Sequence, residues 1–255
     1  MRKYIISIIL LCSNLLFGNL EINFIGQYGL NFIFSSVDVK YNYKNSVYNS
    51  IKGGLGGDVS AFFQIGNYFK LFKNPNDLIK GASLFFDFGY SLNGGMNEYK
   101  DPDTNRKNTE LIFYHSIALG IAGKLNFSKM SIGLGTGILA TIYAQTGSSE
   151  YYGTIITPDL RGWKTSDMRN LFKAPIMPYV KFTIEGYYYI VEGIDAAISI
   201  GGYVMYNFGM QYKTDVINQN IVASVFNKYN FSALSFGVLF GASLGRTDGT
   251  HKFIF

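Results

Sequence analysis

The sequence predicts an all-β protein, a transmembrane antiparallel up-and-down β-barrel of about eight strands. Three observations predict this fold: an N-terminal export segment, eight long segments in which apolar residues alternate with polar or small ones, and connections that alternate between long and short. Alternation with a period of two is typical of a strand whose two faces meet different surroundings. A bilayer leaves no backbone group unpaired, so exported strands of this kind favour a closed barrel.

The composition indicates one β-rich domain. The 255 residues include 22 Phe, 20 Tyr and 29 Gly, with only 15% charged residues and 5 Pro. We find no low-complexity tract that would join separate domains. Loss of Arg2 and Lys3 with the export segment lowers the net formal charge from +5 to +3, a balance too mild for a nucleic-acid-binding protein.

Residues 1–18 form the expected export segment, a cleaved signal peptide, and residues 19–255 the barrel domain. Arg2 and Lys3 precede an apolar stretch over 4–11, and Gly18 offers a small residue at a cleavage point. Lipidation of Cys12, the only cysteine, is the alternative, and under either reading no disulfide holds the fold. We therefore expect export through the inner membrane to the outer membrane, and no apolar run after residue 18 is long enough for a membrane helix.

Residues 130–144 illustrate the choice between three readings. Gly133 and Gly137 have the G-x-x-x-G spacing of membrane-helix pairs, while Gly135, Gly137 and Ala140 fit a variant dinucleotide loop. Parity favours the third reading, a strand. The segment is also too short for a membrane-spanning helix but long enough for a membrane-spanning strand. On this parity one face carries Met130, Ile132, Leu134, Thr136, Ile138, Ala140, Ile142 and Ala144, and the other carries Ser131, Gly133, Gly135, Gly137, Leu139, Thr141 and Tyr143.

The same alternation recurs along the mature chain, with the apolar set expected outside and the polar or small set inside. Several segments exceed ten residues, whereas strands of soluble domains average about 5 to 6. A soluble β-sandwich or a lipocalin-like barrel remains the alternative. The eight expected strands are 22–34, 55–65, 82–92, 111–124, 130–144, 176–190, 194–209 and 234–244.

The connections give an independent check. With the N-terminus on the periplasmic side, odd connections should be long surface loops and even ones short turns. The expected long loops are 35–51, 93–110, 145–175 and 213–229, the tight turns are 126–129 and 191–193, and 67–80 is the exception. Inner faces rich in Gly, Ser and Ala suit a narrow barrel that side chains nearly fill.

With these features the chain resembles the small eight-stranded outer-membrane barrels of the OmpA-transmembrane-domain and OmpX type. Its last five residues, HKFIF, resemble the aromatic-terminated signal of that family, in which Phe253 and Phe255 carry the match. The resemblance implies outer-membrane lipid, a lipopolysaccharide-like glycolipid and the barrel-assembly machinery as partners. Gly249 departs from the pattern because it interrupts the last strand.

Four ionisable residues fall on expected inner faces at membrane depth: Asp58, Asp87, Lys181 and Glu185. Ionised groups at this depth must be paired or hydrated. We expect a lumen charge network in which Lys181, Asp58 and Asp87 approach each other near mid-depth. Such a network either plugs the lumen and fixes strand register or lines a conducting path.

The loop over 145–175 combines Trp163 with basic residues: Arg161, Lys164 and Arg169. Tryptophan and arginine are common anchors of protein contacts, and basic groups also suit anionic sugars or phosphates. The residues are a candidate surface-loop contact, with a solvated loop as the alternative.

No catalytic, metal-binding or cofactor-binding constellation is expected. Only two histidines occur, His115 and His251, and adjacent strand positions place His115 and Ser116 on opposite faces. We expect a non-enzymatic outer-membrane barrel that presents loops for envelope integrity, adhesion or contact with a host surface or extracellular ligand. A narrow channel for small solutes or apolar ligands is the alternative.

Overall fold

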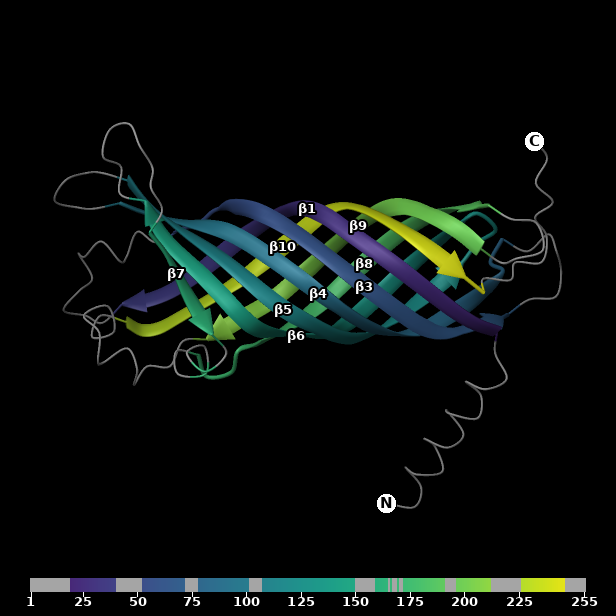
Figure 1. Ribbon diagram of the computed structural model, residues 1–255, viewed down its shortest axis with the longest axis horizontal. Coiled ribbons are helices and arrows are strands. Elements are labelled where there is room, and N and C mark those ends of the chain that lie inside the picture. The colour runs from purple at the N-terminus through teal and green to yellow at the C-terminus, as the bar shows by residue number, and fades with distance from the viewer. Residues whose placement is uncertain are drawn as a thin grey trace, which may run out of the picture.

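The chain folds into a single antiparallel sheet that closes on itself (Figure 1). The computed structural model describes residues 19–39, 52–71, 78–100, 107–149, 159–164, 166, 169, 172–190, 196–211 and 226–245. No helix within these residues is long and apolar enough to cross a membrane. The strands are β1 Asn19–Val39, β2 Lys52–Gly53, β3 Leu55–Lys70, β4 Gly81–Lys100, β5 Lys107–Asn126, β6 Met130–Ser149, β7 Asp159–Lys164, β8 Ile176–Tyr189, β9 Ala196–Gln211 and β10 Phe226–Leu244.

Eight long strands make the wall of the barrel, and each pairs with its neighbours along the chain. The ring closes where β1 pairs with β10, and every pairing is antiparallel. Two short strands lie outside this ring: β2 pairs with the end of β4, and β7 pairs with the end of β6. The expected antiparallel up-and-down barrel of eight strands is confirmed.

The strand registers fix how far the strands tilt. Following the paired residues strand by strand from Ile22 around the ring leads back to β1 at Phe32, ten residues farther along. A stagger of ten residues over eight strands gives a tilt of about 40°, for a rise of about 3.3 Å per residue and a strand spacing of about 4.8 Å. A barrel of this size has an interior just wide enough for side chains to fill.

Alternation sorts the side chains between wall and lumen as expected. Phe86 is 58% exposed, its neighbour Asp87 is 2% exposed, and Phe88 is again 54% exposed. The same contrast runs along the other long strands, where Leu, Ile, Val, Phe and Tyr cover the outside and Asn, Gln, Ser and charged residues point inward. An apolar outer belt and a polar interior are the reverse of a soluble protein and typical of a membrane barrel.

The two ends of the barrel differ. The start of β1 and the end of β10 lie together at one end, which we call the terminus end, with the connections β3–β4, β5–β6 and β8–β9 (Figure 1). The opposite end, the loop end, carries the connections β1–β3, β4–β5, β6–β8 and β9–β10. At the terminus end the β5–β6 turn is tight, with Phe127 N donating to Met130 O at 2.8 Å.

Several strands extend beyond the expected bounds at the loop end. The segment 93–110, expected to be a loop, is mostly strand, because β4 continues to Lys100 and β5 begins at Lys107. The expected loop 145–175 likewise begins as the end of β6 and contains β7. These strand ends mix polar and apolar residues, so hydrophobic alternation does not mark them, whereas backbone pairing with the neighbouring strand does.

The parity of β6 was predicted wrongly at its loop end. A β-bulge shifts the β5–β6 register between His115 and Ser116, which pair with Tyr143 and Thr141. The extra residue, Ile142, reverses the alternation, so Tyr143 faces outward beside His115 and Ala144 is buried inside. A bulge adds one residue to one strand, and a period-two pattern cannot register that addition.

Candidate functional site: the polar lumen

Among the described residues the lumen contains two buried ion pairs, and the first joins β4 to β8. Lys181 on β8 places Nζ 3.0 Å from Asp87 Oδ2 on β4, and both side chains are almost completely buried. Gln64 Nε2 donates to the second carboxylate oxygen, Oδ1, at 2.6 Å. The Lys181 ammonium also lies 3.7 Å from the centroid of the Phe62 ring, where a cation is stabilised by the π-face.

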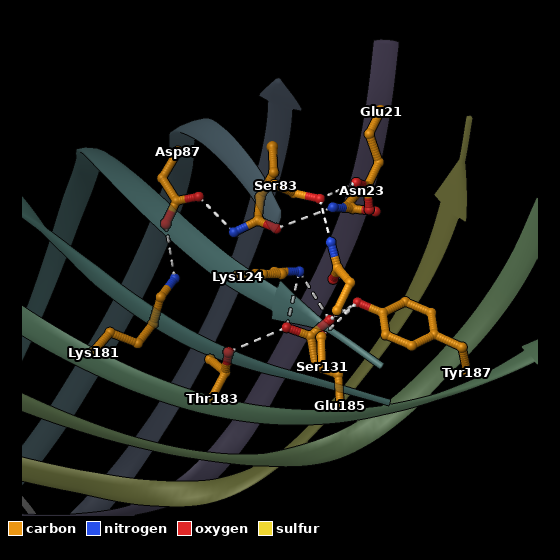
Figure 2. A network of polar contacts seen from close by, with 12 residues as sticks. Glu21, Asn23, Ser83, Asp87, Lys124, Ser131, Lys181, Thr183, Glu185 and Tyr187 are labelled. Atoms are coloured by element: carbon orange, nitrogen blue, oxygen red, sulfur yellow. Dashed lines mark hydrogen bonds and ion pairs between the residues drawn. The ribbon is translucent and has the colours of Figure 1, made fainter. Parts of the chain in front are cut away.

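The second ion pair, shown in Figure 2, was not anticipated. It lies nearer the terminus end, where β5 ends at Asn126 and β8 ends at Tyr189. Lys124 Nζ on β5 is 2.9 Å from both carboxylate oxygens of Glu185 on β8. Tyr187 OH donates to Glu185 Oε2 at 2.8 Å, and Thr183 Oγ1 donates to Oε1 at 3.2 Å. Lys124 is buried on the inner face of β5, and the alternation along 111–124 is the signal that could have identified it.

Glu21 extends the polar layer at the terminus end. Its Oε2 accepts from Ser83 Oγ at 2.6 Å, and Ser83 Oγ in turn accepts from Asn126 Nδ2 at 2.6 Å. Its other oxygen, Oε1, is buried without a hydrogen-bond partner among the described residues. Figure 2 shows Glu21 and Ser83 on the side of the network away from Glu185.

Asp58 occupies a separate polar cluster closer to the loop end. Its carboxylate accepts from Ser60 Oγ at 2.7 Å and from Tyr203 OH at 2.8 Å. Among the described residues Lys181 lies within ion-pair distance of Asp87 and not of Asp58. The four expected lumen residues therefore all point inward, but they divide among three clusters that share the lumen.

A cluster of buried apolar side chains lies in the lumen near the loop end. Tyr114 and Phe231 stack with ring centroids 5.0 Å apart, and Phe172 contacts Phe231 edge-on at 6.0 Å. Phe172 lies between β7 and β8 and is 2% exposed; the next residue, Lys173, donates its backbone N–H to Gln211 O at 2.9 Å. We call this cluster the apolar cap; it also includes Ile33, Ile112, Ala144, Met177 and Met210.

The expected surface-loop contact is not a loop throughout. Arg161, Trp163 and Lys164 lie in β7, where Trp163 pairs with Ala144 and Lys164 pairs with Tyr143. Lys164 and Arg169 are exposed, and the side chains of Arg161 and Trp163 lie outside the described part of the structure. Consecutive strand positions belong to opposite faces, so Trp163 and Lys164 are not placed as one surface.

The histidine available for chemistry lies on the outer wall. His115 Nδ1 is hydrogen-bonded to Tyr90 OH, whereas Ser116 points inward and shares a hydrogen bond with Thr141 at 3.2 Å. No group of three His, Cys, Asp or Glu that could hold a metal ion occurs in the described residues. The export segment 1–18, His251 and the terminal Phe253 and Phe255 lie outside the described residues, so their expected roles stay predictions.

Comparison with known proteins does not show a family for the chain. No protein-family model matches the chain, and no curated protein matches it in sequence. Similar solved structures include the outer-membrane protease OmpT from Escherichia coli, with 8% identity over 89% of this chain and 97% of that chain and a TM-score of 0.42. The outer-membrane protein OprG from Pseudomonas aeruginosa has 12% identity over 90% and 99%, with a TM-score of 0.39.

A third similar structure is the attachment invasion locus protein Ail of Yersinia pestis in complex with the heparin analogue sucrose octasulfate. It has 8% identity over 88% of this chain and 99% of that chain, with a TM-score of 0.35. At these scores the neighbours carry no information about function. The chain has the architecture of the small eight-stranded outer-membrane barrels because of its own closed strand pairing and apolar exterior.

Proposed function

We propose that this protein is a non-enzymatic outer-membrane barrel that presents its loop-end hairpins at the cell surface, for envelope integrity, adhesion or contact with a host surface or extracellular ligand. The observation that carries the proposal is the contrast between a filled lumen and long hairpins. Inward side chains are buried at successive levels and end in the apolar cap, whereas β4, β5 and β6 run on past the apolar belt.

The outer belt is tall enough for a bilayer. Exposed apolar side chains on β1 extend from Leu20 to Phe34. At about 3.3 Å per residue and a tilt of about 40°, this distance projects to about 35 Å along the barrel axis, which spans the roughly 30 Å hydrocarbon core. The partners that follow are outer-membrane lipid, including a lipopolysaccharide-like glycolipid, and the barrel-assembly machinery, with no nucleic acid.

A narrow channel is the second candidate, and lumen charge favours it. The buried charged groups among the described inner residues are four carboxylates, Glu21, Asp58, Asp87 and Glu185, and two ammonium groups, Lys124 and Lys181. The excess of negative charge suits passage of small cations if the apolar cap opens. The non-enzymatic display barrel is the better supported proposal because the cap is packed in the structure.

Refolding of the mature chain into phospholipid vesicles tests both candidates. We expect β-type circular dichroism, faster gel migration without boiling than after boiling, and no steady conductance in a planar bilayer. A helical spectrum or identical migration would overturn the membrane barrel. Steady, cation-selective conductance of the unmodified protein would favour the channel over the display barrel.

A further inference from the structure

The bulge in β6 creates a polar row on the outer wall. Because Ile142 is the extra residue, Tyr143 leaves the lumen and its ring lies 5.3 Å from that of His115 on β5. The His115 ring also contacts Tyr90 on β4, with centroids 6.1 Å apart. Bulges often serve to re-aim a side chain, and this one adds a tyrosine to the outer wall beside His115.

Lys164 continues the row onto β7. Its register partner is Tyr143, and directly paired residues of antiparallel strands lie on the same face of a sheet. Lys164 is exposed, as expected for that outer face. In Figure 1 the start of β5, the end of β6 and β7 lie at the loop end of the barrel. The row therefore runs across four strands, from Tyr90 through His115 and Tyr143 to Lys164.

The hydrogen bonds within the row assign donor roles to two of its groups. In the tautomer in which Tyr90 OH donates to His115 Nδ1, the ring proton is on Nε2, which becomes a donor. Gln145 Nε2 donates to Tyr143 OH at 3.3 Å, so that hydroxyl is occupied as an acceptor and keeps its own proton for another group. Together with the Lys164 ammonium, the row offers donors of the kind that bind an anion.

The row reaches the loop-end border of the apolar belt at Tyr143, because Ile142 is the last exposed apolar side chain described on β6. On β4 the exposed Met96 lies beyond Tyr90 toward the loop end, so Tyr90 lies deeper in the belt. Nearer the terminus end, the same strands expose mostly apolar side chains, including Phe88, Leu119 and Ile138. Tyrosines at the upper border of a barrel wall sit at the level of lipid headgroups, with their hydroxyls toward water. At the level of the headgroups, a lipid-facing wall is next to the phosphate groups of lipids. A lipid phosphate is therefore the anion that fits these donors.

We infer that Tyr90, His115, Tyr143 and Lys164 form a binding site for the phosphate group of a membrane lipid in the leaflet at the loop end. The inference rests on the proposed function, since it requires the barrel to span a bilayer. Such a site differs from ordinary interfacial anchoring by aromatic rings, which depends on the ring and not on its hydroxyl. The variants that test the site should therefore remove hydrogen-bonding groups and charge but keep the rings.

The test uses the full mature chain refolded in phosphatidylcholine vesicles that contain a minor fraction of phosphatidic acid, whose headgroup is a bare phosphate. After mild detergent extraction, native mass spectrometry counts the phosphatidic acid retained per barrel. We expect Lys164→Gln to lower retention about fivefold, the ratio typical of one basic group at an anionic lipid surface. We expect Tyr143→Phe to lower it as well and His115→Phe with Lys164→Gln to abolish it.

Tyr188→Phe is the matched control, because Tyr188 is an exposed tyrosine near the β8–β9 connection at the terminus end. It should leave retention unchanged. Equal retention in wild type, Tyr143→Phe and Lys164→Gln would overturn the site while leaving the barrel intact. Displacement of the lipid by added inorganic phosphate would also overturn it, because the row would then bind free anions. If the wild type fails to insert, as judged by unboiled migration, the proposed function fails instead.

Tyr143→Phe keeps the test decisive if the double variant does not fold. It removes one oxygen atom from an outward side chain and leaves the ring contact with His115 in place. A folded Tyr143→Phe barrel that retains wild-type amounts of phosphatidic acid is evidence for aromatic anchoring alone.

Discussion

Replacing Lys181 by Met tests the central ion pair of the lumen. The side chain is 2% exposed and its ammonium bonds to Asp87 across the barrel. Methionine has a similar length, so it keeps the contact with the Phe62 ring but carries no charge. The variant therefore leaves the Asp87 carboxylate buried with Gln64 as its remaining hydrogen-bond donor.

The expected cost is large because one partner of a buried pair is left behind. Removing one partner of such a pair costs about 3 to 5 kcal/mol, and the hydrogen bond from Gln64 favours the lower value, about 3 kcal/mol. With a urea m-value of about 1 to 3 kcal/mol/M, the unfolding midpoint should fall by about 1 to 3 M. The variant should still be closed in a planar bilayer, since the apolar cap is unchanged.

A second substitution separates direct pairing from overall charge balance. Asp87→Asn in the Lys181→Met background removes the stranded charge, and Asn can still accept from Gln64, so most of the lost stability should return. Asp58→Asn in the same background removes an equal charge from a carboxylate that Ser60 and Tyr203 already satisfy, and should not restore it. Equal rescue by both, or no effect of Lys181→Met on the urea midpoint, would refute the pairing.

Three further changes test the cap, the wall and the loop end. Phe172→Ala should open the apolar cap and give measurable single-channel conductance, while the unboiled protein still migrates as a folded barrel. A variant as closed as wild type would mean that the polar layers seal the barrel without the cap. Gly56→Ala should impair refolding, because the added Cβ would lie 2.0 Å from Gly94 O. Gly57→Ala is the control and should refold like wild type, because its Cβ would lie 3.9 Å from the nearest backbone atom. Equal refolding yields for the two variants would contradict this contrast. Deleting 155–170 removes β7, which is outside the eight-strand ring, so membrane insertion should survive; loss of insertion would make β7 part of the assembly.

The inside and outside of the wall were predictable from the sequence because a bilayer and a narrow lumen demand opposite side chains. Asp58, Asp87, Lys181 and Glu185 all lie on the face that parity assigned to them. Their partners were not predictable in the same way. Which lysine meets which carboxylate depends on stagger around the ring, and one strand's pattern contains no information about the stagger of the others.

The loop end was the least predictable part. Strand ends such as 93–100 and 145–149 continue by backbone pairing alone, and the bulge at Ile142 moved Tyr143 from the expected inner face to the outer one. Phe172 gave no signal in the sequence, because a phenylalanine in a polar segment reads as a loop residue. Its role depends on the long-range hydrogen bond of Lys173 to Gln211 and on the Phe231 ring.

The two ion pairs help to fix the register between strands, which hydrophobic alternation determines only in part. A slip of one residue between neighbouring strands would turn apolar side chains into the lumen, so alternation opposes it strongly. A slip of two residues keeps every apolar side chain outside, but it shifts the strands by about 7 Å relative to each other. Such a shift between β4 and β8 would separate Lys181 from Asp87, and one between β5 and β8 would separate Lys124 from Glu185.

Both ion pairs span several strands, so each also depends on the registers between its ends. Asp87 and Lys181 are separated by the pairings β4–β5, β5–β6 and β6–β8, and an even slip in any one of them, left uncompensated in the others, breaks the pair. Buried ion pairs add little net stability relative to apolar residues of the same volume, but they strongly penalise an arrangement that leaves one charge alone. We therefore interpret the lumen charges as determinants of the ten-residue stagger of the barrel.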